Sequence, residues 1–347
     1  MNLLVSGNAH LYYPCDICFA LLGDAGGNTM PLPPVSPMAG EWGEALSTQM
    51  PLEEEAFMPQ YIDLVYLSLA EGAFYSLEKP LPLDKMLQLW NEKDKKGEKI
   101  DYQYLIVGFA PYGRVAVWFK GIRKSILLAW EEADEIQVEM SEFRPNNPGL
   151  TLGEYCDYYF RDGTPAGNHI RIHGLPPRNL FDKYMQQYNY RYVPHFMHWD
   201  DEAEDWIPYQ EREVAPKLEY IEEALFDGTH DKLNDGGLLQ YHTGGKPKKL
   251  MLAWRIGKAQ YSAYFWMDEE IICQEFEDFY GLHPDTPVDL SLHVDYERMI
   301  FEFSLFRQGL HQPRYLSPDT YQIIVFKDGF ERFRTDNYDQ SHGAWVW

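Results

Sequence analysis

The stretch "DYQYLIVGFAPYGRVAVWFKG", residues 101–121, contains two apolar runs separated by a short segment with Pro111 and Gly113. A phosphate-binding loop groups its glycines before a helix, so that backbone N–H groups converge on the anion. Here the residues at 115–119 alternate and are β-branched or aromatic, which is typical of a strand. Pro111 favours the second position of a turn, and Gly113 allows an unusual backbone near its end. The stretch therefore predicts a β-hairpin and not a nucleotide-binding loop.

The elements around this hairpin recur later in the chain. Residues 61–78 have strand character, and "PLDKMLQLWNEK" at 82–93 has helical spacing before the hairpin begins. The same order returns over 247–281 and 288–306, where two strands, a helix and two further strands are expected. Aligned landmarks include Leu64 with Leu252 and Tyr66 with Trp254. This order predicts a tandem duplication of a β-β-α-β-β unit.

We therefore expect an α+β fold in which antiparallel sheets carry packed helices. Within the connecting region we expect a helix over 181–188, a strand over 188–199 and a second helix from Pro216 to Gly228. The expected organisation is an irregular, Gly- and Pro-rich N-terminal arm (1–58), a first β-β-α-β-β unit (59–145), a connecting region with helices (146–240), and a second unit with C-terminal strands (241–347).

The charge balance narrows the classes of partner. The chain has 54 acidic and 30 basic residues and a net charge of −24, so its surface should repel phosphate backbones and attract a basic partner. Nucleic-acid binding is therefore not expected. No run of about 18 apolar residues is present, which argues against a membrane span. The first basic residue is Lys79, so a secretory signal is also not expected, and we place the protein in the cytoplasm.

Several residue groups resemble catalytic or metal sites only superficially. Cys15 and Cys18 form a C-x-x-C with no second ligand pair nearby. His195 and His198 should lie on opposite faces of a strand, which disfavours joint ligation of a metal. His169 and His173 share a face in an extended run but have no carboxylate nearby in the sequence.

The loop "DGTHDKLNDGG" at 227–237 groups Asp227, His230, Asp231 and Asp235, but it lacks the ligand spacing of a calcium loop. Turn formation and helix capping explain this loop better. The sequence contains no G-x-S-x-G, no H-E-x-x-H and no Walker-type lysine loop. We therefore predict no catalytic residue, no metal and no cofactor.

Two acidic clusters combine carboxylates with tryptophan. Charge runs are usually solvated faces, but carboxylates can steer a basic protein while neighbouring aromatic rings anchor it. The candidate partner-binding residues are Trp199, Asp200, Asp201, Glu202, Glu204, Asp205 and Trp206 in "HWDDEAEDW", and Glu131, Glu132, Asp134 and Glu135 in "WEEADE".

Several segments together resemble a bacterial family known as domain of unknown function 2931. They are "LSLAEGAFYSLEKPLPLDKMLQLW", "YLIVGFAPYGRVAVWFKG", "LFDGTHDKL", "GKPKKLMLAW" and "FRTDNYDQSHGAWVW", so the resemblance runs from about residue 61 to residue 347. Many members of that family look like envelope lipoproteins, whereas this chain shows no lipid-attachment cysteine. The resemblance supplies no catalytic residues. Relatives tend to lie beside interbacterial toxin genes such as Rhs and type VI effectors, which suggests immunity proteins.

These observations together predict a cytosolic immunity protein that binds a cognate toxin domain and blocks its active site. A toxin that acts on nucleic acid or on a nucleotide cofactor, such as a nuclease or an ADP-ribosyltransferase, often presents a basic cleft that carboxylates can occupy. One alternative is an enzyme of unrecognised type that acts on a small molecule, with its site at 227–235 or 195–201. Another alternative is a non-catalytic ligand-binding protein.

Overall fold

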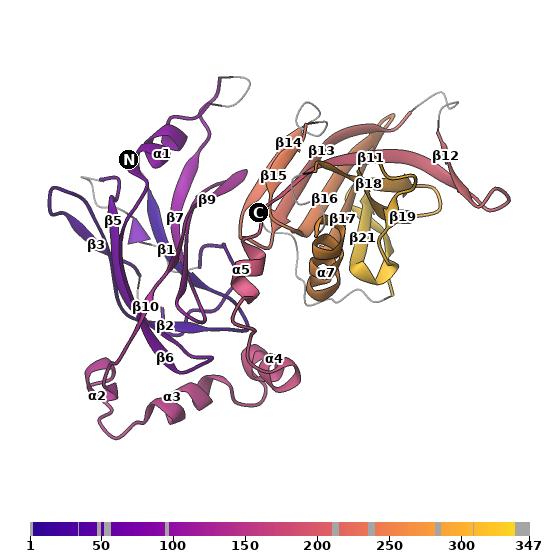
Figure 1. The fold of residues 1–347 in the computed structure, drawn as a ribbon. Coiled ribbons are helices and arrows are strands. Elements are labelled where there is room, and N and C mark those ends of the chain that lie inside the picture. The colour runs from indigo at the N-terminus through magenta and orange to yellow at the C-terminus, as the bar shows by residue number, and fades with distance from the viewer. Residues whose placement is uncertain are drawn as a thin grey trace. The chain divides into compact units, whose positions relative to one another are not determined.

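In the computed structural model the chain forms two compact units, each described by itself below (Figure 1). Unit 1 comprises Met1–Tyr184 and Asp227–Thr229, and unit 2 comprises Met185–Phe226 and His230–Trp347. The structure describes residues 3–33, 35–46, 50–51, 57–93, 97–209, 215–234, 240–281, 286–307 and 309–336.

Unit 1 contains two β-sheets that enclose its main core. Its first sheet has the strand order β10-β6-β5-β2-β3, with bounds β2 Cys15–Gly23, β3 Thr29–Pro31, β5 Tyr61–Ser68, β6 Ala73–Pro80 and β10 Asp134–Ile136. Its second sheet has the order β9-β8-β7-β1-β4, with bounds β1 Leu4–Ala9, β4 Met50–Pro51, β7 Tyr102–Ala110, β8 Arg114–Gly121 and β9 Lys124–Glu132. Alternate side chains of both sheets meet in one apolar cluster that includes Val5, Leu64, Val107 and Val117.

Helices complete unit 1. Helix α1 (Leu83–Trp90) connects the two sheets, and its buried Met86 packs into the main core. A second apolar cluster forms where α2 (Met140–Phe143) and α3 (Leu152–Tyr159) meet strands β5 and β6. Helices α4 (Pro165–His173) and α5 (Leu180–Tyr184) end the unit.

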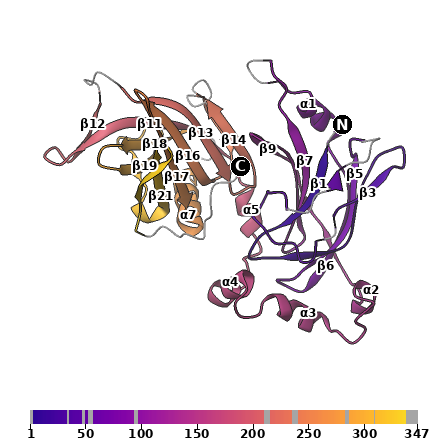
Figure 2. The ribbon, with the colours of Figure 1, turned by 180° about the vertical axis from the view of Figure 1, so that it is seen from behind.

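Unit 2 also contains two sheets, which are visible from both sides in Figures 1 and 2. Its first sheet has the order β22-β21-β17-β16-β13-β14, with bounds β13 Lys217–Leu225, β14 His230–Asn234, β16 Pro247–Ile256, β17 Ala259–Met267, β21 Tyr321–Lys327 and β22 Phe330–Arg334. Its second sheet has the order β12-β11-β18-β19-β20, with bounds β11 Tyr188–Asp200, β12 Asp205–Pro208, β18 Val288–Asp295, β19 Ile300–Arg307 and β20 Arg314–Tyr315. Strand β15 (His242–Gly244) pairs with β11, helix α7 (Glu269–Tyr280) connects the sheets, and η1 (Pro318–Thr320) precedes β21.

The hairpin predicted from residues 101–121 is confirmed. Strands β7 and β8 pair antiparallel up to Ala110 and Arg114. Tyr112 and Gly113 in the turn have φ of 59° and 76°, a left-handed region that suits glycine. The two strands contribute to the second sheet of unit 1.

The two units share an order of strand pairing. In unit 1 the hairpin β5–β6 lies beside β2, and in unit 2 the hairpin β16–β17 lies beside β13. After the helix, β7 pairs parallel with β1 and antiparallel with β8, as β18 does with β11 and β19. The last strand then returns to the first sheet, where β10 pairs with β6 and β21 with β17.

The fold is predominantly β, and its sheets are mixed. Most pairs are antiparallel, as expected, but β1–β7 and β11–β18 are parallel. Parallel partners need a long crossover, and these strands are separated by many residues. Alternation within one strand carries no information about the direction of so distant a partner.

The expected N-terminal arm and connecting region differ from the structure. Residues 1–58 contain β1, β2 and β3, and Val5 in β1 is fully buried. The Gly- and Pro-rich composition of 20–58 accounts for missing only β3 and β4, because β1 and most of β2 precede that stretch. The connecting region 146–240 is divided between the units, because α3 to α5 belong to unit 1 and β11 to β14 to unit 2.

Two helices expected in the connecting region are also corrected. Residues 217–225 form strand β13, because pairing with β16 and β14 outweighs the helical preference of its Glu, Ala and Leu residues. The helix expected over 181–188 covers Leu180–Tyr184 only, and β11 begins at Tyr188. In contrast, the strand expected over 188–199 is confirmed as part of β11.

Candidate partner-binding surface

The acidic segment 198–206 forms one end of a hairpin in unit 2. Trp199 in β11 pairs with Trp206 in β12, and Asp200 pairs with Asp205. The centroids of the two tryptophan rings are 5.5 Å apart. The residues at 201–204, which join the strands, are exposed, as is Asp205 at the start of β12. The hairpin therefore presents a run of carboxylates to solvent.

A buried carboxylate fixes both sides of this hairpin. Asp295, at the end of β18, is fully buried. Its Oδ2 accepts a hydrogen bond from the backbone N–H of Trp199 (3.1 Å), and its Oδ1 accepts one from the hydroxyl of Tyr209 (3.0 Å). The backbone N–H groups of Glu297 and Arg298 also donate to Oδ1, at 3.1 and 3.0 Å. Asp295 thus ties the hairpin to the turn that follows β18.

The turn of the hairpin is held by further polar contacts. The Nη1 of Arg298 donates to the carbonyl of Trp199 (2.9 Å) and lies 2.9 Å from Oδ2 of Asp201. The Oδ1 of Asp200 accepts hydrogen bonds from the backbone N–H groups of Glu202 (2.9 Å) and Ala203 (3.1 Å). Those two bonds lower the pKa of Asp200, because they favour its charged form. The geometry of the acidic turn is therefore preorganised.

The two tryptophans of this segment have different environments. Trp206 is buried, its Nε1 donates to Oε2 of Glu302 at 2.6 Å, and its ring lies 5.4 Å from that of His293. Trp199 is partly exposed. Trp206 therefore anchors the hairpin to the sheet, and Trp199 is the ring of the pair that a protein partner could cover.

The second acidic cluster lies in unit 1. Glu131 and Glu132 are at the end of β9, and Asp134 and Glu135 are in β10. Glu132 is 2.8 Å from Nη1 of Arg114, so part of its charge is compensated. The exposed carboxylates of Asp134 and Glu135 form no ion pair among the described residues. The sequence indicated both clusters but not these differences between them.

The C-x-x-C segment lies in β2, not in an irregular loop. Both cysteines are free thiols; Cys15 is buried and Cys18 is partly buried. Burial, with Asp16 nearby, raises the pKa of Cys18 to about 12. The thiolate of Cys18 is therefore scarce at neutral pH, which disfavours nucleophilic chemistry.

The histidines singled out in the sequence are also placed by the structure. The ring of His195 is near that of His293 (5.3 Å), whereas the ring of His198 is near that of Tyr209 (5.6 Å). These separate neighbours agree with opposite faces of β11. His169 and His173 lie on helix α4, not on a strand, with their rings stacked at 4.5 Å.

The loop that begins at Asp227 forms a turn. Oδ1 of Asp227 accepts hydrogen bonds from the backbone N–H (2.9 Å) and the hydroxyl (2.6 Å) of Thr229. His230 and Asp231 belong to β14, and Asp235 lies outside the described residues. Over the part of the chain that the structure describes, no group of three or more potential ligands is placed to hold a metal.

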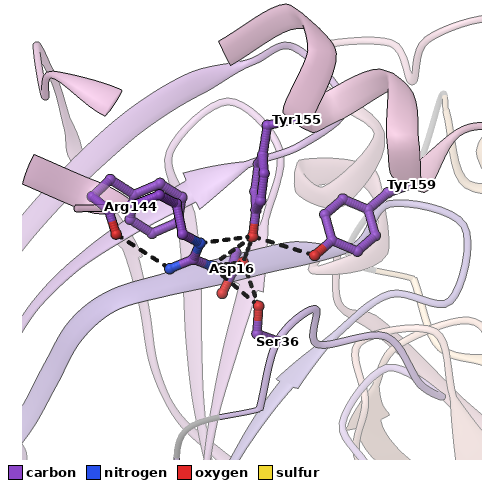
Figure 3. A network of polar contacts seen from close by, with 6 residues as sticks. Asp16, Ser36, Arg144, Tyr155 and Tyr159 are labelled. Carbon is purple, nitrogen blue, oxygen red and sulfur yellow. Dashed lines mark hydrogen bonds and ion pairs between the residues drawn. The ribbon is translucent and has the colours of Figure 1, made fainter. Parts of the chain in front are cut away.

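A buried polar network in unit 1 was not anticipated (Figure 3). Oδ2 of the buried Asp16 accepts hydrogen bonds from Ser36 (2.6 Å), Arg144 and Tyr155, and the hydroxyl of Tyr159 donates to that of Tyr155 (3.2 Å). The network connects β2 to α3 and to the residue after α2. Because its donors already share one internal acceptor, we assign it to structure and not to binding.

The residues that position the acidic hairpin were missed by sequence reasoning. Asp295 followed by a turn is a recognisable signal, because Asp often accepts hydrogen bonds from backbone N–H groups two and three residues later. Its bond to Trp199 could not be inferred, since the two residues are far apart in the chain.

Comparison with known proteins identifies a family for part of the chain. Residues 11–175 match the family model described as a protein of unknown function, DUF2931. The match begins earlier than the resemblance seen in the sequence and ends before the segments of unit 2 on which that resemblance partly rested. No curated protein and no solved structure matches. No helix among the described residues is long and apolar enough to cross a membrane.

Proposed function

We propose that this chain, whose residues 11–175 belong to the DUF2931 family, is a cytoplasmic immunity protein that binds and blocks an interbacterial toxin. The observation that carries the proposal is the preorganised acidic hairpin formed by β11 and β12. Its exposed turn is fixed by Asp295 and Arg298, so little ordering is needed when a partner binds.

The charge of the chain supports a basic partner. A net charge of −24 steers a cationic surface toward the protein over a Debye length of about 10 Å at 0.1 M salt. A toxin that acts on a nucleic acid or on a nucleotide cofactor uses cationic side chains to bind phosphate. Carboxylates held in a rigid turn could occupy the same cleft, and the toxin would then lose access to its substrate.

We also propose that the two units arose by duplication. The landmarks aligned in the sequence occupy matching register positions: Tyr66 pairs with Tyr75, and Trp254 pairs with Tyr261. If one copy served mainly as scaffold, the other would have been free to acquire a binding hairpin.

The proposal is tested with two charge-reversal variants of equal size. Glu202→Lys with Glu204→Lys alters the hairpin at exposed positions that form no ion pair among the described residues. Asp134→Lys with Glu135→Lys makes the same change of net charge in unit 1 and serves as the matched control. Each variant is co-expressed with the product of the adjacent gene, tested as the candidate toxin, and both cell survival and complex formation are measured.

We expect the hairpin variant to lose protection and the control variant to keep it. Circular dichroism should show both variants folded. If wild-type protein neither binds nor protects against the adjacent toxin, the proposed function is wrong. If only the control variant loses protection, the contact lies at residues 131–135 instead of at the hairpin.

A further inference from the structure

We infer that the outer face of the second sheet of unit 2 binds an arginine side chain of the protein partner. This face is next to the acidic hairpin. The inference rests on the proposed function for the identity of the partner, but the geometry of the site stands by itself. We call the site the arginine shelf and define it by Ser291, His293, Glu302, Ser304, Trp206 and Tyr315.

Strand register places the floor of the shelf on one face. His195 pairs with His293, and His293 pairs with Glu302. Ser291 pairs with Ser304 in the same two strands, two residues from His293 and Glu302 respectively. Side chains two residues apart point to the same side of a sheet. The intervening Leu292 and Phe303 point to the opposite side, where they are buried.

The floor contains polar groups that lack partners. Ser304 is 1% exposed and Ser291 is 8% exposed, yet neither hydroxyl forms a hydrogen bond with any described residue. The Nδ1 of His293 is buried and also unpaired among the described residues. Because these groups form no hydrogen bond with the described residues, they are available to a ligand or partner.

Aromatic rings flank these polar groups. The ring of Trp206 lies 5.4 Å from that of His293, and the ring of Tyr315 lies 6.2 Å from it. Tyr315 is 46% exposed, so one side of its ring is open to a partner. Aromatic faces attract planar cations, and guanidinium stacks on them more often than ammonium does.

Two carboxylates give the shelf its charge. Oε2 of Glu302 accepts the hydrogen bond from Trp206, and its Oε1 has no hydrogen-bond partner among the described residues. Among the same residues, Asp205 accepts only from the backbone N–H of Trp206. Neither carboxylate forms an ion pair within the described ranges. The shelf therefore carries negative charge that no cation in the described part of the chain compensates.

The two histidines, His195 and His293, do not repel a cation at neutral pH, because they are uncharged there. Burial, with His195 nearby, lowers the pKa of His293 to about 4, and burial also lowers the pKa of His195. A neutral imidazole has a nitrogen that can accept a hydrogen bond. A guanidinium has five donors in a planar fork, which suits Glu302, the serine hydroxyls and an imidazole better than one ammonium group would.

The shelf is tested on the free protein with a short peptide that has one arginine between glycines. Matched peptides carry lysine or citrulline in its place; citrulline keeps the planar shape without the charge. NMR spectra of the imidazole protons of His195 and His293 and of the indole N–H of Trp206 report binding. We expect saturable shifts with arginine, at least severalfold weaker binding with lysine, and none with citrulline.

A conservative variant locates the contact. Glu302→Gln removes the charge but retains an oxygen that can accept from Trp206, and it should weaken binding of the arginine peptide about tenfold, which corresponds to one charge-assisted hydrogen bond. Asp319→Asn, which changes an exposed carboxylate in η1, should leave the affinity unchanged. The inference would be overturned if the arginine peptide caused no chemical-shift changes in the protein. It would also be overturned if the citrulline peptide caused the same changes, or if Glu302→Gln left the affinity for the arginine peptide unchanged.

The outcomes separate the two proposals. If the arginine peptide binds and binding depends on Glu302, but the protein does not protect against any adjacent toxin, the shelf is supported and the proposed function is wrong. If the hairpin variant loses protection but the wild-type protein does not bind the arginine peptide, the proposed function is supported and the inference of an arginine site is wrong. If both are correct, Glu302→Gln should also speed dissociation of the toxin complex.

Discussion

The second sheets of the two units have related topology but different outer faces. In unit 1 the segment 40–46, which we call the strap, covers polar side chains of β1. The amide of Asn8 donates to the carbonyls of Glu41 (2.9 Å) and Glu44 (2.7 Å). The backbone N–H of Leu46 donates to Oγ of Ser6 (3.0 Å). The side chains of Asn8 and Ser6 are thus satisfied within the unit, whereas the buried Nε1 of Trp42 has no hydrogen-bond partner among the described residues.

In unit 2 the corresponding face is closed only in part among the described residues. Asp295 is satisfied by Trp199 and Tyr209. The side chains of Ser291 and Ser304 form no hydrogen bond with any described residue, and Glu302 has no cation partner there. The difference shows that sheets with the same order of strand pairing can satisfy their polar side chains to different degrees. We therefore expect substitutions on the two faces to act on different properties.

The largest expected effect comes from opening the strap. Trp42 is 3% exposed, and its ring lies 4.9 Å from that of Trp118 and 5.0 Å from that of Phe181. Trp42→Ala should lower the free energy of unfolding by about 3–5 kcal/mol, because it removes a buried aromatic side chain and leaves a cavity. Denaturation in guanidinium chloride measures this change.

The matched substitution on the open face is Tyr315→Ala. Because that ring is 46% exposed, the free energy of unfolding should change by less than about 1 kcal/mol. If both variants lowered the free energy of unfolding equally, the two faces would be equally well packed. The contrast drawn here between the faces would then be wrong.

Local signals explain which parts of the fold could be predicted. The hairpin at 101–121 depends on Pro111, Gly113 and strand alternation, which are adjacent in sequence. Strand β13 was mistaken for a helix because its pairing with β16 is a tertiary interaction. The capping box of α3, Thr151 with Glu154, was a local signal that could have revealed that helix.

The candidate site was predictable only in its local composition, the carboxylates with Trp199 and Trp206 on either side. The carboxylates of 200–205 stand together in the sequence, so the acidic turn was evident. Glu302 is 96 residues from Trp206, and Asp295 is 96 residues from Trp199. Contacts over such separations depend on the strand order, and no periodicity within one segment reports that order.

A second prediction compares the turns of the two second-sheet hairpins. Gly113 has φ of 76°, and a Cβ there would lie 2.7 Å from the carbonyl oxygen of Ala133. Gly113→Ala should therefore cost about 1–3 kcal/mol through backbone strain and the clash. Met299, in the turn of unit 2, has φ of 59° with a side chain already present.

Met299→Gly should relieve this left-handed strain and raise the free energy of unfolding by up to about 1 kcal/mol. Thermal melting of both variants measures the contrast. The contrast between the turns would be wrong if Gly113→Ala raised the free energy of unfolding. It would also be wrong if Met299→Gly lowered the free energy of unfolding as much as Gly113→Ala does.

A third prediction concerns pH and the open face. The pKa of His293 is lowered to about 4, so its contribution to stability is complete above the ordinary value of about 6.5 and is lost as the pH falls from 6.5 to 4. Because the ring is partly exposed, solvent screening should limit the loss to about 1–2 kcal/mol.

His293→Gln should remove this part of the pH dependence, since glutamine does not titrate. Unfolding free energies of wild type and variant are compared at pH 6.5 and pH 4.5. If the free energy of unfolding fell equally in both proteins between pH 6.5 and pH 4.5, His293 would titrate normally. The shelf would then not be a desolvated site.

The smallest expected effect is at the tip of the hairpin. The ion pair of Asp201 with Arg298 spans 2.9 Å, but the two side chains are 71% and 48% exposed. Exposed pairs contribute about 0.2–1 kcal/mol, and salt screens them. Asp201→Asn should therefore lower the free energy of unfolding by no more than about 0.5 kcal/mol, and the loss should vanish in 0.5 M salt.

Arg298→Ala should lower the free energy of unfolding slightly more, because it also removes the hydrogen bond to the carbonyl of Trp199. If either variant destabilised the protein as much as Trp42→Ala, the hairpin would be part of the core of unit 2, and its acidic turn would not be a surface held ready for a partner.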